Sequence, residues 1–126
     1  MKILSIETSC DETAISILNA SGDLKSPSFD ILANNLISQI DVHKEFGGVY
    51  PSLAKREHAK NLPIILEKTL KDAKFFIEEN NQIDKNIILK TLEREPEMAD
   101  KLFDIVSKIK KPEIDFIAVT TGPGLE

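Results

Sequence analysis

The chain has 126 residues, enough for one compact domain and too few for two full ones. Hydrophobic residues make up 41% of the sequence, so a core can form, and the net charge of −5 excludes a general electrostatic attraction for polyanions. One cysteine excludes an internal disulfide, and the sequence shows neither a run of about 18 apolar residues nor a signal-peptide pattern. We therefore expect a cytoplasmic protein.

The N-terminal third of the chain predicts three strands. Residues 2–6 and 14–18 are rich in isoleucine and leucine, and the short link between them favours an antiparallel hairpin. The link, "ETSCDET" at 7–13, is unusually polar for a hairpin loop. "NASGDL" at 19–24 has the composition of a turn, and a third strand is expected within 29–40.

A long helix is expected after the loop marked by Gly47 and Gly48, beginning at Pro51 or Ser52. Pro63 falls inside this stretch and removes one backbone donor, so we expect one kinked helix rather than two separate ones. The apolar face, with spacings of three and four residues, comprises Leu62, Leu66, Leu70, Ala73 and Ile77.

Two further helices and one strand are predicted in the last third of the chain. "IDKNIILKTL" suits a short helix, and "PEMADKLFDIVSKIKK" suits a second one that begins at Pro96 and ends before Pro112. "IDFIAVTT" at 114–121 is apolar throughout and too short for a helix. This pattern predicts a strand buried on both faces of a parallel or mixed sheet.

Two loops could hold a phosphate group. In the first loop, Ser9, Thr13 and backbone amides can donate to its oxygens, and Asp11 can hold a metal ion or water beside it. In the second, Gly122 and Gly124 let the backbone approach a ligand closely. The same residue types also make ordinary turns, so composition alone leaves both interpretations open.

The order of the elements is typical of a known superfamily. A hairpin with a phosphate-type loop, a third strand, a helix and a buried strand ending in glycines resembles the first lobe of the actin/sugar-kinase/Hsp70-like (ASKHA) fold. We therefore expect an α/β fold with a mixed sheet of βββαβ type. Residues 1–126 would be a partial N-terminal lobe with a helical insertion at about 80–111, and the second lobe would be absent.

Three stretches resemble the TsaD family, the universal tRNA threonylcarbamoyladenosine synthases once described as sialoglycoproteases. "IETSCDET" at 6–13 is similar to the opening of the family. "HKEFGGVYPSLAKREHAKNLP" at 43–63 is similar to its His-x-x-Tyr-Gly-Gly-Val-x-Pro…Ala-x-Arg-x-His segment, with Phe46 in the tyrosine position. "IDFIAVTTGPGLE" matches its strand and Gly-Pro-Gly-Leu, and the order and spacing agree apart from residues 80–111.

The resemblance implies transfer of a threonylcarbamoyl group from threonylcarbamoyl-AMP to N6 of adenosine 37, in tRNAs that read codons beginning with A. Asp11 and Glu12 would be the catalytic side chains. The implied cofactor is an iron or zinc ion, and the implied partners are tRNA, an inactive paralogue subunit and the small ATPase of the bacterial t6A complex. The nucleotide-binding residues would be Ser9, Thr13, Gly122 and Gly124.

The family's metal-binding His-x-x-x-His motif does not occur in residues 1–126, because His43 and His58 lie 15 residues apart. We therefore expect the metal ligands to lie outside this chain and His43 to form a loop hydrogen bond. The chain is expected to be an N-terminal fragment that has no transferase activity alone.

Other assignments and functions are considered beside this one. Lys55, Arg56, His58 and Lys60 could form a wall of the cleft, a tRNA-facing patch or an ordinary solvated face. Cys10 is expected to be a small buried loop residue, since no neighbouring base would activate it. The alternative functions are a non-catalytic paralogue-type scaffold, against which "SCDET" and "REH" argue, and a sugar or acetate kinase lobe, which would need a glycine-richer phosphate loop.

Overall fold

A four-stranded mixed sheet forms one layer of the computed structural model, which describes residues 1–122 of the chain. In the order β3-β2-β1-β4, β1 pairs antiparallel with β2 and parallel with β4, and β2 pairs antiparallel with β3. The strands are β1 (Lys2–Glu7), β2 (Glu12–Gly22), β3 (Pro27–Ser38) and β4 (Phe116–Val119). The expected mixed α/β arrangement, with three strands before the long helix and one after it, is confirmed.

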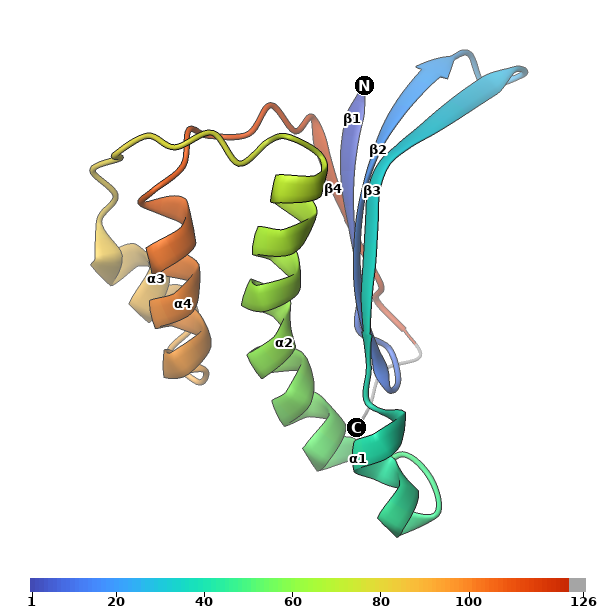
Figure 1. Cartoon of the computed structure of the whole chain (residues 1–126), viewed down its shortest axis with the longest axis vertical. Coiled ribbons are helices and arrows are strands. Elements are labelled where there is room, and N and C mark those ends of the chain that lie inside the picture. The colour runs from blue at the N-terminus through green and yellow to red at the C-terminus, as the bar shows by residue number, and fades with distance from the viewer. Residues whose placement is uncertain (123–126) are drawn as a thin grey trace.

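The longer helices lie on one face of this sheet. Figure 1 shows α2 beside the strands, with α3 and α4 on the side of α2 that faces away from them. The elements are α1 (Ile40–His43), the 3₁₀ turn η1 (Lys44–Phe46), α2 (Pro51–Asp72), α3 (Lys85–Thr91) and α4 (Pro96–Val106). Among the helices of the described residues, none combines the length and apolar character needed to cross a membrane.

The core lies between the sheet and α2. Leu4 is opposite Ile17 in the β1–β2 ladder, and Ile15 lies two residues before Ile17, so all three side chains point to the same face of the sheet. The buried cluster comprises Leu4, Ile15, Ile17, Ile65, Leu70, Ile105 and Ile109. The helical segment after residue 80 therefore contributes to the core through Ile105 at the end of α4.

The β2–β3 turn lies later in the chain than the sequence predicted. The prediction of a turn at 19–24 is wrong in position, because β2 continues to Gly22 and pairs with β3 up to that point. Asp23 makes the turn instead, since its Oδ1 accepts hydrogen bonds from the amides of Lys25 and Ser26, both at 2.8 Å.

Gly22 is the residue that allows this turn. It has φ +84°, and a Cβ added there would lie 2.2 Å from the carbonyl oxygen of Ser26. We expect Gly22→Ala to reduce the free energy of unfolding by at least about 1–2 kcal/mol, because a residue with a Cβ pays that cost for a left-handed backbone and the clash with Ser26 O adds to it. Gly48→Ala is the control, because a Cβ there meets nothing within 4 Å. Urea denaturation of both variants checks the difference, and equal stabilities would contradict it.

The long helix is a single helix, as predicted, and it runs through Pro63 without interruption. The predicted apolar face is confirmed at Leu70, but the buried face also takes in residues outside the prediction. The buried positions of α2, some of them polar, are Ala54, His58, Asn61, Pro63, Ile65, Thr69 and Leu70. Leu62 and Leu66 are only partly buried, and Ile77 lies beyond the end of the helix. α2 packs against both the sheet and α4, so its burial does not follow one leucine stripe.

β4 occupies the predicted place in a mixed sheet, but the prediction that it is buried on both faces is wrong. All four of its residues are exposed. β4 pairs with β1 at the edge of the described sheet, and α2 lies against β2 and β3 rather than against β4. The apolar sequence of β4 indicates a tendency to be buried, but whether β4 is buried depends on whether a helix packs against it.

Residues 77–110 contain the two predicted helices, and backbone hydrogen bonds join the beginning of this segment to its end. The amide of Glu79 donates to Lys108 O at 2.8 Å, and that of Lys110 donates to Ile77 O at 2.8 Å. Lys85 and Asp100 form an ion pair of 2.7 Å between α3 and α4. The segment therefore leaves and rejoins the rest of the fold at neighbouring points.

Candidate functional site

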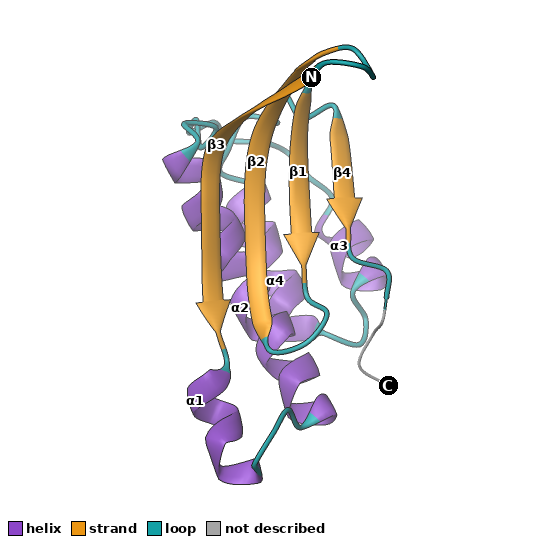
Figure 2. Cartoon of the chain, turned by 90° about the vertical axis from the view of Figure 1, so that its right-hand side faces the viewer, coloured by secondary structure: helices purple, strands orange, loops and turns teal. Residues whose placement is uncertain are grey.

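The polar 7–13 loop and the carboxyl end of β4 lie at the same end of the sheet, where β1 and β4 finish (Figure 2). β1 and β4 are parallel, so their carboxyl ends meet there. The amide of Thr120 donates to Ile6 O at 3.1 Å, and the Thr120 hydroxyl donates to a carboxylate oxygen of Glu7. Gly122 follows in a bend two residues later, whereas Gly124 lies outside the described residues.

The two carboxylates proposed for catalysis lie at the surface of this loop. Glu12 is exposed and Asp11 is half-buried, while Ser9 is half-buried and donates its amide to Glu7 Oε1 at 2.7 Å. The amide of Gln39 donates to the carbonyl oxygen of Asp11 at 2.8 Å. The loop is therefore held at its backbone, and Glu12 is its exposed carboxylate.

Cys10 corrects one expectation. Its side chain is exposed and its thiol is free, whereas the sequence suggested a small buried residue. Partial desolvation, and then the hydrogen bond and charge of Asp11, raise the pKa of the Cys10 thiol above its ordinary value. The thiolate is thus disfavoured, and Cys10 has no environment that would activate it as a nucleophile.

A buried group of polar side chains lies beneath the loop. His58 Nδ1 is 2.8 Å from the Thr13 hydroxyl and 3.2 Å from Gln39 Nε2, and His58 Nε2 is 3.0 Å from the carbonyl oxygen of Cys10. Thr13 is fully buried, so its hydroxyl serves the underside of the loop rather than its surface. Among the described residues, no buried side-chain nitrogen or oxygen lacks a hydrogen-bond partner.

The same group extends to the loop after η1. Gln39 Oε1 is 3.0 Å from His43 Nε2, and the amide of Tyr50 donates to His43 Nδ1 at 3.3 Å. His43 therefore forms the hydrogen bonds expected of it, although it belongs to α1 and is buried. Gln39 was not singled out by the sequence, because a glutamine at the end of a strand carries no motif.

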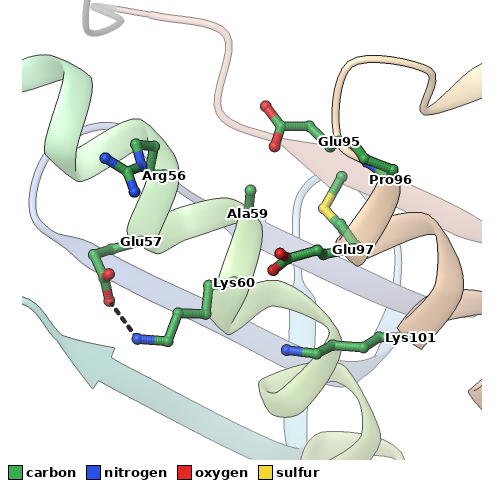
Figure 3. Close-up of a pocket in the computed structure, with 9 residues that line it drawn as sticks. Arg56, Glu57, Ala59, Lys60, Glu95, Pro96, Glu97 and Lys101 are labelled. Atoms are coloured by element: carbon green, nitrogen blue, oxygen red, sulfur yellow. Dashed lines mark hydrogen bonds and ion pairs between the residues drawn. The ribbon is translucent and has the colours of Figure 1, made fainter.

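The basic cluster at the start of α2 separates into two parts. His58 turns toward the polar loop, whereas Lys55, Arg56 and Lys60 are exposed. Lys60 pairs with Glu57 at 3.3 Å, which is the compensation expected of a solvated helix face. Figure 3 shows this face beside a pocket of about 300 Å³ between α2 and α4, whose charged lining residues are Arg56, Glu57, Lys60, Glu95, Glu97 and Lys101.

A second hollow, of about 390 Å³, adjoins the loop on the sheet face that α2 does not cover. Small side chains make its floor: Ser5 is opposite Ser16 on β2 and opposite Ala118 on β4. Glu7 and Thr120 complete its rim at the site edge. We place the candidate site here rather than in the α2–α4 pocket, because here the two predicted loops meet.

Residues 1–122 do not present the side chains of a metal centre. Within this described part, no group of three histidine, cysteine, aspartate or glutamate side chains converges to hold an ion.

Glu7 should titrate below the usual range of a glutamate. Hydrogen bonds from Ser9 and then from Thr120 lower its pKa. The carboxylate thus stabilises the folded chain above the ordinary glutamate pKa, and this contribution is lost as pH falls through the lowered value. We expect Thr120→Val to raise the pKa of Glu7 toward the ordinary value, as measured by NMR titration of its side-chain carbonyl. The same change at Thr91, in α3, should leave it unaltered.

Comparison with known proteins identifies relatives. Residues 30–84 match the family model TsaD, described as tRNA N6-adenosine threonylcarbamoyltransferase. The chain is 48% identical over 86 residues to the protein of that name from Prochlorococcus marinus strain MIT 9301, covering 68% of this chain and 23% of that protein. It is 46% identical over 83 residues to the Fusobacterium nucleatum protein of that name, with coverages of 66% and 22%. It is 49% identical over 71 residues to that of Thermotoga neapolitana, with coverages of 56% and 20%. The chain spans less than a quarter of the length of each.

Proposed function

Since the chain belongs to the tRNA N6-adenosine threonylcarbamoyltransferase (TsaD) family, we propose that it forms the first lobe of an enzyme that transfers a threonylcarbamoyl group to N6 of adenosine 37 in tRNAs reading A-starting codons. The observation that carries the proposal is the convergence of the 7–13 loop and the end of β4 at one sheet edge. The order of strands around α2 supports an ASKHA lobe.

The proposed reaction joins an exocyclic amine to a mixed carbamoyl-phosphate anhydride. A bond forms between N6 and the carbamoyl carbon, the bond from that carbon to the phosphate oxygen breaks, N6 loses a proton and AMP leaves. Asp11 and Glu12 would orient the amine or accept its proton, because their carboxylates are accessible on a loop held at its backbone. Ser9 and the bend at Gly122 would lie beside the phosphate.

The remaining components of the proposal follow the family. The donor is threonylcarbamoyl-AMP, and an iron or zinc ion is held by residues other than those of this chain. The partners are tRNA, an inactive paralogue subunit and a small ATPase, all in the cytoplasm. Residues 1–126 alone should give no product.

A chimaera tests the proposal. Residues 1–126 replace the corresponding first lobe of the Thermotoga neapolitana relative, and the protein is assayed with threonylcarbamoyl-AMP, tRNA and the relative's own partner proteins. We expect the modified nucleoside, detected by mass spectrometry, at a rate within roughly tenfold of the relative's, a loss equivalent to about 1.4 kcal/mol in the barrier. A chimaera that is folded but forms no product above background would overturn the proposal.

A further inference from the structure

We propose that His58 and Gln39 are positioning residues that fix the backbone on both sides of Asp11. The carbonyl before Asp11, that of Cys10, is 3.0 Å from His58 Nε2. The carbonyl oxygen of Asp11 itself accepts a hydrogen bond from the backbone N–H of Gln39 at 2.8 Å. The catalytic consequence rests on the proposed function, whereas the positioning itself does not.

The contacts identify the ring nitrogen of His58 that donates toward the loop. The carbonyl oxygen of Cys10 can only accept a hydrogen bond, so the hydrogen of the ring lies on Nε2. Nδ1 then accepts from the Thr13 hydroxyl at 2.8 Å and from Gln39 Nε2 at 3.2 Å. Nε2 is therefore the ring nitrogen of His58 that donates to the loop.

The contacts also determine the orientation of the side-chain amide of Gln39. Its Nε2 lies 3.4 Å from Ala54 O, which can only accept, so Oε1 faces His43 Nε2 at 3.0 Å. His43 consequently carries its hydrogen on Nε2, and its Nδ1 accepts the Tyr50 amide.

Two fixed peptide planes determine where the Asp11 side chain points. Because each peptide unit is planar and trans, the plane before Asp11 is set by the Cys10 carbonyl and the plane after it by the Asp11 carbonyl. The direction of the Cα–Cβ bond of Asp11 follows from these two planes. The backbone N–H of Asp11 belongs to the same trans peptide unit as the Cys10 carbonyl, so it points away from His58.

The burial of the donors makes this arrangement stiff. His58 is 6% exposed and Gln39 is 1% exposed, so water does not readily replace either bond. Both donors lie on elements that pack against the sheet or continue from it, namely α2 and the end of β3. A reacting group positioned by such elements is held more closely than one on an unsupported loop.

Two substitutions at His58 separate positioning from volume. His58→Gln keeps an amide donor near the Nε2 position, whereas His58→Leu keeps apolar volume and has no donor. In the 126-residue chain, we expect His58→Leu to accelerate hydrogen exchange of amides 8–12 by about tenfold or more, the effect of losing a buried hydrogen bond. His58→Gln should stay near the parent rate, and so should Lys55→Ala, an exposed position on the same helix.

A measurement on the unsubstituted chain keeps the proposal testable if His58→Leu does not fold. Long-range ¹H–¹⁵N correlations should show His58 with a hydrogen on Nε2. An Nε2 without a hydrogen would overturn the proposal, and so would a folded His58→Leu chain whose loop exchange matches that of the parent.

The chimaera supplies the catalytic readout. There, His58→Leu should lower kcat at least about tenfold while KM for tRNA changes little, and His58→Gln should restore most of kcat. An inactive parent chimaera would contradict the proposed function, and the exchange and tautomer measurements would still decide the positioning role. Equal kcat values for the two His58 variants and the parent would overturn the catalytic consequence.

Discussion

Asp11→Asn in the chimaera is expected to lower kcat for threonylcarbamoyl transfer by about a hundredfold or more, the usual range for losing a positioned acid–base group. The asparagine side chain keeps the shape of the aspartate but cannot accept the proton that N6 releases. Because Asp11 is half-buried and its backbone bonds do not involve the carboxylate, the substitution should leave the fold intact. Transfer under saturating donor and tRNA, followed by mass spectrometry of the nucleoside, measures the effect.

The matched control is Asp104→Asn, the same chemical change at an exposed position on α4. It should leave kcat unchanged, and both variants should melt at the temperature of the parent chimaera. If Asp11→Asn transferred as fast as the control, Asp11 would have no catalytic role and the proton would have to leave by another route.

The sequence predicted those parts of the fold that depend on neighbouring residues. Segments rich in isoleucine and leucine located β1 and β2, and the prolines at 51 and 96 marked the starts of α2 and α4. The two loops could also be assigned to one edge, because a parallel pair of strands brings its carboxyl ends together. Local propensity and spacing are sufficient for features of this kind.

The parts that were missed depend on contacts between distant residues. His58 reaches Cys10 and Thr13 across 48 and 45 positions, and the motif around His58 does not show that its side chain contacts the 7–13 loop. One signal was present: His58 lies four residues after Ala54 and continues toward Ile65 on the buried stripe of α2. The exposure of β4 could not be inferred, because it depends on which element covers the sheet there.

Ile17→Ala should produce the largest loss of stability in the chain. Ile17 is fully buried at 0% exposure, in the middle of β2, opposite Leu4 on β1 and Ala33 on β3. The substitution removes three buried carbons and leaves a cavity between the sheet and α2. We expect it to reduce the free energy of unfolding by about 2–5 kcal/mol. A single domain is stable by only about 5–15 kcal/mol, so this loss would be a large fraction of the total.

The comparison that isolates burial is Ile31→Ala, the same change on β3 at a side chain that is 65% exposed. It should cost less than about 1 kcal/mol, the span of strand propensity. Ile17→Val should fall between the two, at about 0.5–1.5 kcal/mol, because it removes one methyl group. Urea denaturation of the three variants gives the order directly. If Ile17→Ala and Ile31→Ala destabilised the chain equally, Ile17 would not be enclosed between β2 and α2, and the packing that supports the 7–13 loop would have to be reassigned.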